Sequence, residues 1–188
     1  MRVPRVRTDR LLLRAWRAAD LRPFAEMNAD PEVMEHFPSI LSRRESDEQV
    51  GRFRDRWRDD GHAPWAVELR EGGAFIGYVG LATPRFEAHF TPAVEVGWRL
   101  ARSAWGKGFA TEGARAALAF GFDRLSLAEI VSFTVPANVR SRRVMERLGM
   151  ACDPADDFDH PRLPRGHPLQ HHVLYRLRRD AWERGTGR

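Results

Sequence analysis

The residues from Glu95 to Glu112, EVGWRLARSAWGKGFATE, combine types that could do chemistry at one place. A strand pattern leads into a glycine-rich loop, and the loop leads directly into a helical pattern. Glycine lets a backbone approach a ligand closely and adopt positive φ, and the first amides of a helix have no partner within it. Together with the helix dipole, such amides bind an anion, for which a pyrophosphate is a natural candidate.

Two other phosphate loops do not fit this segment. A Walker loop needs a lysine followed by serine or threonine, but Gly108 follows Lys107 here. The dinucleotide fingerprint GxGxxG fails because Thr111 stands where its third glycine belongs, after Gly106 and Gly108. That fingerprint also opens an early strand–helix–strand unit, whereas this loop lies past the middle of the chain.

The loop resembles instead the pyrophosphate loop of the GNAT N-acetyltransferases. That loop has Gln or Arg first, Gly fourth and Gly or Ala last; here Trp105 departs from the pattern, whereas Gly108 and Ala110 match it. WGKGFATE is similar to the form of the loop in the RimJ/RimL branch. Residues 138–150, NVRSRRVMERLGM, resemble the family pattern NxxSxxVxExxGF, and the opening TDRLLLRAW also resembles this branch. The resemblance therefore covers nearly the whole chain.

The resemblance implies a transferase that moves an acetyl group from acetyl-CoA to a primary amine by direct attack in a ternary complex. Its sheet would splay between the strand containing Glu95 and the strand ending at Val135, with the pantetheine beside the first of these strands. The pyrophosphate would meet the loop amides, and Asn138 and Ser141 would face the thiol end. The cofactor-binding residues that the resemblance implies are Trp98, Arg99, Leu100, Trp105, Gly106, Lys107, Gly108, Phe109, Ala110, Thr111, Asn138 and Ser141.

Glu95 is the expected catalytic base. An amine with a pKa of about 10 is almost fully charged at pH 7, so a base helps the transfer. Glu95 is a carboxylate in an otherwise apolar strand pattern, AVEVGW, and burial would raise its pKa toward a useful value. A glutamate on this strand could instead face solvent or pair with an arginine. We expect the oxyanion donor to be a backbone N–H near Gly97 and Trp98.

Ser141 is the expected second catalytic residue. Many GNAT enzymes carry a tyrosine acid seven residues after the asparagine, but Met145 stands there and has no proton to donate. The RimL resemblance suggests Ser141 as the donor to the leaving sulfur; the alternative is a serine that bonds backbone in the first helical turn. Tyr175 could also donate, although a buried, anchored tyrosine is the simpler interpretation. Cys152 lacks a placed base, and the family transfers directly, so we expect no covalent role for it.

Residues 156–172, DDFDHPRLPRGHPLQHH, concentrate four of the seven histidines. Their spacing matches no compact ligand motif, and we expect no metal. We expect residues 153–170 to form a long loop that covers the acceptor pocket, with an ordinary capping loop as the alternative. The candidates for acceptor contact here are Asp159, His160, His172 and Tyr175.

The coarse pattern predicts an α/β protein with a mixed sheet. An antiparallel meander leads into strand–helix–strand units, and the resemblance implies a sheet splayed at the cofactor cleft with helices on both faces. The predicted strands are 8–17, 64–70, 74–82, 93–100, 129–135 and 171–177, the predicted helices are 19–29, 31–37, 42–60, 108–125 and 138–148, and 181–188 is a frayed tail.

Length and composition limit the number of domains and the class of protein. The 188 residues favour one domain, 1–188, and 43% hydrophobic with 30% charged residues is a globular balance. The net charge is +5, from 31 Lys and Arg against 26 Asp and Glu, but no compact basic block predicts nucleic-acid binding. No apolar run predicts a membrane span, and the single cysteine favours a reducing, cytoplasmic setting.

Three functions remain open on the sequence alone. The first is the N-acetyltransferase, whose acceptor is a protein N-terminus or a small amine and which the resemblance allows to be a homodimer. The alternative is a non-catalytic acyl-CoA-binding protein of the same fold that acts as a sensor or partner. A basic module that binds RNA or the ribosome is the third, although no RNA motif is present.

Overall fold

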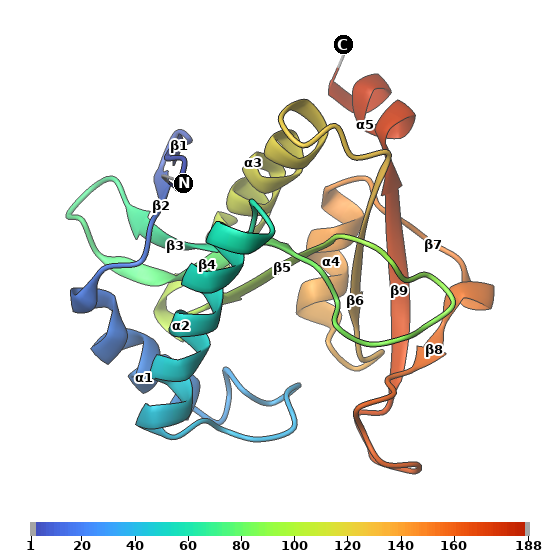
Figure 1. Cartoon of the computed structure of the whole chain (residues 1–188), viewed down its shortest axis with the longest axis horizontal. Coiled ribbons are helices and arrows are strands. Elements are labelled where there is room, and N and C mark those ends of the chain that lie inside the picture. Colours follow the sequence, from blue (N-terminus) through green and yellow to red (C-terminus); the bar gives the residue numbers. More distant parts are fainter. Residues whose placement is uncertain (1–2, 187–188) are drawn as a thin grey trace.

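The strands form one mixed sheet around which the chain is organised (Figure 1). The computed structural model describes residues 3–186, and its sheet has the order β1-β2-β3-β4-β5-β6-β9-β7, with β8 pairing to β9. The strands are β1 Val6–Arg7, β2 Leu11–Arg14, β3 Pro64–Leu69, β4 Phe75–Ala82, β5 Glu95–Leu100, β6 Glu129–Thr134, β7 Ala151–Cys152, β8 Phe158–Asp159 and β9 His171–Arg178. Antiparallel pairing holds throughout except between β5 and β6, which run parallel, so the predicted mixed sheet is confirmed.

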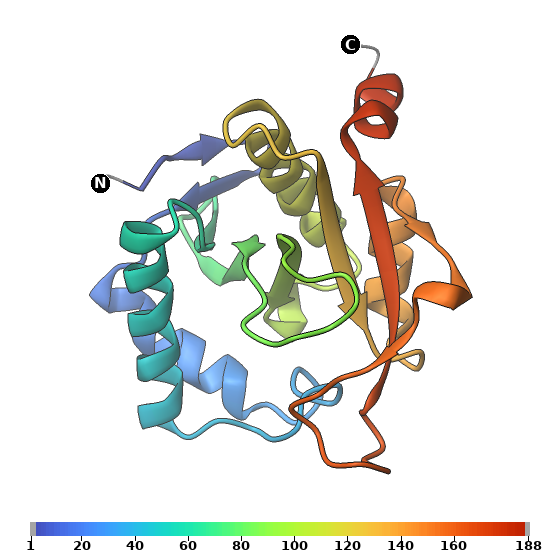
Figure 2. The same cartoon turned by 45° about the vertical axis from the view of Figure 1, so that its right-hand side comes forward.

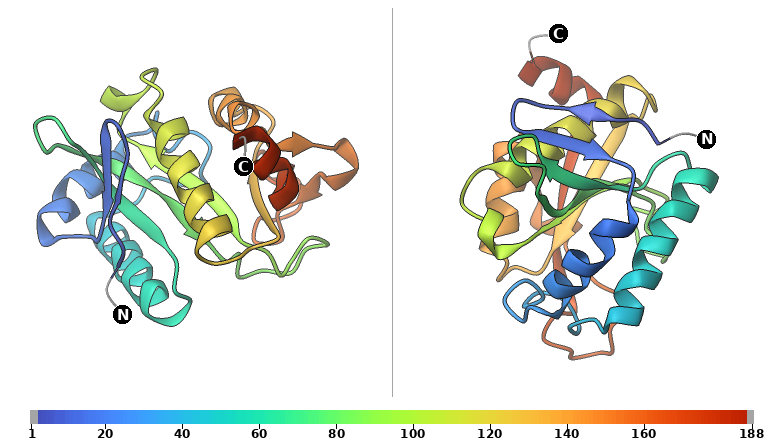
Figure 3. Two further views of the ribbon diagram at one scale, coloured as in Figure 1. Left: turned by 90° about the horizontal axis from the view of Figure 1, so that it is seen from above. Right: turned by 90° about the vertical axis from the view of Figure 1, so that its left-hand side faces the viewer.

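Helices lie on both faces of this sheet. One face carries α1 and α2, and the other carries α3 and α4 (Figure 3). The helices are α1 Leu21–Ala29, α2 Arg43–Asp59, α3 Phe109–Asp123, α4 Val139–Arg147 and α5 Arg179–Thr186. Ser42 caps α2, since its hydroxyl accepts from the Glu45 backbone N–H at 3.3 Å.

The sheet opens between β5 and β6. These neighbours are joined by a single register pair, Glu95 with Val131, whereas β4 with β5 and β6 with β9 pair along six residues each. Beyond this pair the two strands diverge, which leaves the backbone of Trp98 to Leu100 without a partner on the β6 side (Figure 1). The splayed sheet is therefore present where the sequence predicts it.

Close packing of α3 on the sheet depends on two glycines. A Cβ on Gly113 would lie 3.1 Å from Val79 Cγ2, and a Cβ on Gly121 would lie 2.6 Å from Ile130 Cδ1. Larger residues would push the helix away from β4 and β6. The close approach fixes where the first turn of α3 lies relative to the opening.

Three local predictions need correction or refinement. Residues 31–37 form turns, not a helix, because the Asp30 carboxylate accepts from the Glu32 backbone N–H and Pro38 restricts the residue before it. The tail is a helix as far as Thr186, anchored by Trp182 stacking on Phe122, while residues 187–188 lie outside the described part. The long loop contains a short 3₁₀ turn, Pro154–Asp156, and strand β8.

A buried ion pair ties the start of α1 to the sheet. The Arg14 guanidinium donates to both oxygens of Asp20 at 2.7 and 2.8 Å, and the two side chains are 4% and 3% exposed. Removing the carboxylate would leave a buried cation with Glu68 alone to balance it.

Asp20→Ala is therefore expected to lower the free energy of unfolding by about 3 kcal/mol. Urea denaturation followed by circular dichroism measures the change. The control is Glu26→Ala, which removes an exposed partner of Arg22 and should leave the midpoint nearly unchanged. Equal shifts in the two variants would contradict a structural role for the buried pair.

Candidate active site

Two cavities meet at the opening of the sheet. One, of about 350 Å³, is lined by the glycine loop and α4, and we call it the loop cavity. The other, of about 450 Å³, includes His160 and His172 in its wall, and we call it the histidine cavity. The two share five lining residues: His36, Phe37, Trp98, Asn138 and Ser141. Both volumes are in the range of small-molecule sites.

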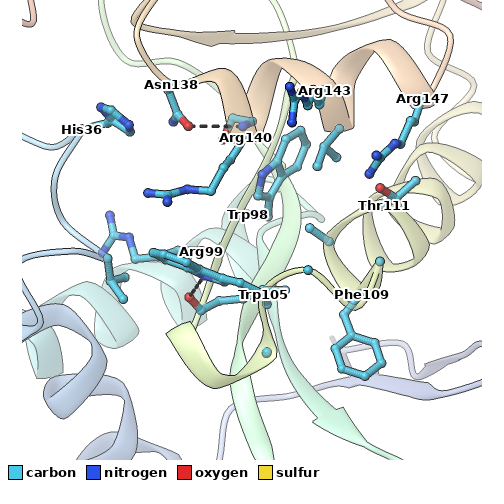
Figure 4. A pocket seen from close by; sticks show the side chains of 18 of the residues that line it. His36, Trp98, Arg99, Trp105, Phe109, Thr111, Asn138, Arg140, Arg143 and Arg147 are labelled. Carbon is cyan, nitrogen blue, oxygen red and sulfur yellow. Dashed lines mark hydrogen bonds between the residues drawn. The ribbon is translucent and has the colours of Figure 1, made fainter.

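The loop cavity contains the glycine loop and the first turn of α3, where the sequence predicts an anion site. Gly108 is the N-cap of α3 with a φ of 79°, and Gly106 has a φ of 72°, so both positions favour glycine. The first bond of the helix runs from the Glu112 N–H to the Gly108 carbonyl, which leaves the preceding amides free for a ligand. Phe109, Ala110 and Thr111 line the cavity with these glycines (Figure 4).

A network from the start of the chain braces this loop from outside. The Glu112 carboxylate accepts from the Thr8 hydroxyl at 2.6 Å and from the Arg10 backbone N–H at 2.8 Å. The Arg10 side chain binds Glu112 and also donates to the Lys107 carbonyl at 2.9 Å. The Arg10 guanidinium lies 4.7 Å over the Phe109 ring. Lys107 is thus held by its backbone and does not line the cavity.

A row of arginines on α4 faces the loop, and sequence reasoning missed it. Arg140, Arg143 and Arg147 line the cavity, and their spacing puts them on one side of the helix (Figure 4). Arg140 lies 4.3 Å over the Trp105 ring and pairs with Glu35. The spacing of three and four residues was the signal that could have found them. Their guanidinium groups suit phosphate oxygens.

Asn138 and Ser141 lie at the junction of the two cavities. The side-chain oxygen Oδ1 of Asn138 accepts from the Ser141 backbone N–H at 3.2 Å, and its side-chain Nδ2 donates to the Thr134 hydroxyl at 3.0 Å. Asn138 therefore caps α4 and fixes the orientation of its first turn. The Ser141 hydroxyl makes no hydrogen bond to any residue within 3–186, so it remains available to a ligand.

Glu95 lies in the wall of the histidine cavity, at the point where β5 leaves β6. No ion pair or hydrogen bond to its carboxylate occurs within the described part of the chain. Burial raises the pKa of Glu95 to about 7, against the opposing positive charges of Arg56 and Arg162. Such a carboxyl is partly ionised near neutral pH and can accept a proton there.

The four predicted acceptor residues divide into two pairs. His160 and His172 line the histidine cavity, and burial lowers the pKa of each. Asp159 faces outward beside His171, because β8 pairs with β9 so that successive residues alternate sides. Tyr175 is buried, with its hydroxyl 3.3 Å from Arg142 Nε and from Glu146, and it lines neither cavity.

The segment 36–38 forms the remaining wall, which the sequence analysis did not predict. His36 and Phe37 line both cavities, and the segment approaches residues 160–170 across the open side of the sheet (Figure 2). Arg99 holds this segment, since its guanidinium lies 3.9 Å over the Phe37 ring and donates to the Asn28 side-chain oxygen at 2.7 Å. These two contacts hold the Arg99 side chain beside the cavity.

Within residues 3–186, no group of three or more His, Cys, Asp or Glu is arranged to hold a metal ion. No helix in the same range is long and apolar enough to cross a membrane. Cys152 is exposed and lines neither cavity.

A mixed sheet that opens between two parallel strands, with the first amides of a helix and a titratable carboxylate at the opening, is an arrangement suited to acyl transfer. Residues 10–151 match the acetyltransferase (GNAT) domain family, and the chain belongs to this family. The protein is an N-acetyltransferase, which transfers an acetyl group to an amine. Acetyltransferases of this fold use acetyl-CoA.

Relatives and solved structures agree with this assignment. YkkB of Bacillus subtilis is 31% identical over 144 residues, which cover 76% of this chain and 83% of YkkB. The N-acetyltransferase YnaD of Bacillus subtilis is 27% identical, covering 94% of this chain and 98% of YnaD. An acetyltransferase structure from Agrobacterium tumefaciens is 28% identical, with 94% and 95% covered and a TM-score of 0.75.

A solved RimL structure has the same fold as this chain. RimL, an alpha-N-protein acetyltransferase solved with coenzyme A, has a TM-score of 0.74 against this chain, with 95% and 99% of the two chains covered. At 15% identity, this likeness concerns the fold.

Proposed function

We propose that the protein binds acetyl-CoA in the loop cavity and transfers the acetyl group directly to a primary amine in the histidine cavity. The observation that carries this proposal is the shared wall of the two cavities, where Trp98, Asn138 and Ser141 separate an anion site from Glu95. A single domain then holds both substrates, and the reaction occurs where the cavities meet.

The residues of the loop cavity fit acetyl-CoA. The β5 backbone at Trp98 and Arg99 lies beyond the single register pair with β6 and suits the amides of pantetheine, which would extend the sheet at its opening. The Leu100 carbonyl accepts from the Trp105 indole N–H at 2.8 Å. The amides at Gly106 to Ala110 suit the pyrophosphate, and the α4 arginines add positive charge for the phosphates. Bound there, acetyl-CoA supplies the acetyl group as an activated thioester.

Glu95 and Ser141 act on opposite sides of the acetyl group. Glu95 takes a proton from the amine, directly or through water, as the new C–N bond forms and the C–S bond breaks. A backbone N–H near Gly97 and Trp98 stabilises the developing negative charge on the carbonyl oxygen. The Ser141 hydroxyl donates a hydrogen bond to the sulfur as it leaves.

Ser141→Ala is expected to lower kcat about tenfold while leaving the affinity for acetyl-CoA nearly unchanged, because one hydrogen bond to the leaving group is lost. Steady-state thiol release measures kcat. Ser141→Thr is the control, since it keeps a hydroxyl and should recover most of the rate. If alanine and threonine variants turn over alike, Ser141 is only a helix residue.

Arg10→Ala is expected to raise KM for acetyl-CoA about tenfold with a smaller effect on kcat, because the loop loses the brace to the Lys107 carbonyl. Initial rates at varied acetyl-CoA concentration measure both constants. Arg43→Ala removes an exposed ion pair on α2 and is the matched control. An unchanged KM for the Arg10 variant would show that the loop keeps its conformation unaided.

The proposal is tested by incubating the protein with acetyl-CoA and a mixture of primary amines, followed by mass spectrometry of the products. We expect acetylated amine together with free CoA. If folded protein that binds acetyl-CoA acetylates no amine, the proposal fails and a non-catalytic acyl-CoA-binding protein becomes the better description.

A further inference from the structure

The histidine cavity is walled by rings on both sides of the splayed sheet. Tyr78 of β4 and Trp98 of β5 line it on one side of the opening. Phe133 of β6, His160 and His172 line it on the other side. A ligand between them would therefore meet aromatic surface from two directions.

The second group of rings is held rigidly. The His172 ring centroid lies 5.9 Å from that of Phe133 and 5.2 Å from that of His160. Behind them, Phe158 lies 5.5 Å from His172, and Phe86 lies 4.6 Å from His160. Rings fixed by such contacts form a preorganised wall, so little freedom is lost when a ligand packs on them.

The charges of the cavity accommodate one ammonium group. Among the described lining residues, Glu95 is the one carboxylate, and Arg162 supplies a permanent positive charge. Burial lowers the pKa of His36, His160 and His172, so these side chains are mainly neutral at pH 7. A second ammonium group on the acceptor would find no anion here and would be repelled by Arg162.

We propose that the acceptor is a primary monoamine joined by a short carbon chain to a planar ring. The amine would face Glu95, and the ring would pack between the two aromatic walls. This inference rests on the proposed function, because it assigns the acceptor of that reaction. It argues against polyamines, whose additional charges the cavity leaves unpaired.

Two classes of acceptor fit this description: an arylalkylamine and an aromatic amino acid. They differ by a carboxylate, which Arg162 at the cavity wall would bind. Arg162→Gln separates them, since it lowers kcat/KM for phenylalanine more than for phenylethylamine when the carboxylate is recognised. If Arg162→Gln changes kcat/KM for the two amines equally, the acceptor is an arylalkylamine.

The test compares kcat/KM for phenylethylamine, cyclohexylethylamine, hexylamine, spermidine and a short peptide, all with acetyl-CoA. We expect kcat/KM for phenylethylamine to be about tenfold higher than for hexylamine and spermidine. The value for cyclohexylethylamine should lie between that of phenylethylamine and those of the other two amines. Binding of the same amines to the CoA-saturated protein, measured by calorimetry, gives a readout that does not need turnover. It should show the same order.

Variants locate the preference in the wall. Phe133→Leu is expected to reduce the ratio of phenylethylamine to hexylamine about fivefold. Phe120→Leu removes a ring that contacts Trp57 and Trp65 and lines neither cavity, so the ratio of phenylethylamine to hexylamine should stay unchanged in that variant. Thermal unfolding shows whether both variants fold.

The two possible failures are distinguishable. Transfer that favours spermidine, hexylamine or the peptide, or equal effects of the Phe133 and Phe120 variants, overturns the ring assignment and leaves the acetyltransferase mechanism intact. Absence of transfer to every amine overturns the proposed function, and the acceptor assignment with it.

Discussion

Glu95→Gln is expected to lower kcat/KM at pH 7 by about a hundredfold, because the amine loses the group that takes its proton. The affinity for acetyl-CoA should be preserved, since Glu95 lines the histidine cavity and not the loop cavity. Thiol-release kinetics measure the first quantity and calorimetry the second. Glu87→Gln, which changes an exposed glutamate in the loop before β5, is the matched control.

The pH dependence of kcat/KM in the same variant tests whether Glu95 is the base. Glu95 must be ionised to accept a proton, so kcat/KM should rise with pH through the pKa of about 7 that burial gives this group. In Glu95→Gln this limb should be absent. A limb near pH 7 that survives the substitution would show that another group is the base.

Loss of activity in Glu95→Gln should not reflect unfolding. The pKa of Glu95 is raised in the folded state, so its ionisation opposes folding as pH rises from 4.5 to about 7. Glutamine carries no charge to bury, so the variant should be at least as stable as the parent at pH 8. Thermal unfolding at that pH measures this.

Gly108→Glu is expected to weaken acetyl-CoA binding by about a hundredfold or more, because it adds negative charge at the N-cap of α3 and a side chain whose Cβ would lie 3.5 Å from Arg10 Nη2, in the brace of the loop. Gly108 has a φ of 79°, so the side chain adds backbone strain of about 1 kcal/mol as well. Calorimetric titration with acetyl-CoA, with ATP as a control ligand, measures the loss.

A matched substitution separates charge at the site from strain. Gly72 has a φ of 76° in the turn between β3 and β4, and a Cβ there meets nothing within 4 Å. Gly72→Glu therefore adds similar strain and the same charge at a position that lines neither cavity, and should leave acetyl-CoA binding unchanged. Equal affinities for the two variants would mean that the loop is not the phosphate site.

The site residues that the sequence predicts are those that can be recognised from their neighbours in the chain. A glycine at positive φ, an N-cap asparagine and a carboxylate in an apolar strand each leave a signature within a few residues. Gly108, Asn138, Ser141 and Glu95 accordingly lie at the opening of the sheet, where the sequence predicts them. Strand and helix order follows from periodicity in the same way.

The parts that were missed depend on contacts distant in sequence. Phe37 reaches the junction because turns replace the predicted helix, and Arg99 holds it from another strand. The brace from Arg10 to the loop joins residues 97 apart in the chain. Asp159 was misplaced because its side depends on the pairing register of β8, which composition does not reveal.

A crystal structure of the protein with CoA tests the central claim most directly, by measuring where the sulfur lies. We expect the pyrophosphate at the amides of Gly106 to Ala110, and the sulfur at the shared wall within hydrogen-bond distance of the Ser141 hydroxyl and facing the cavity that holds Glu95. A sulfur directed away from the histidine cavity, or a pyrophosphate bound outside the loop, would contradict the proposed transfer between the two cavities.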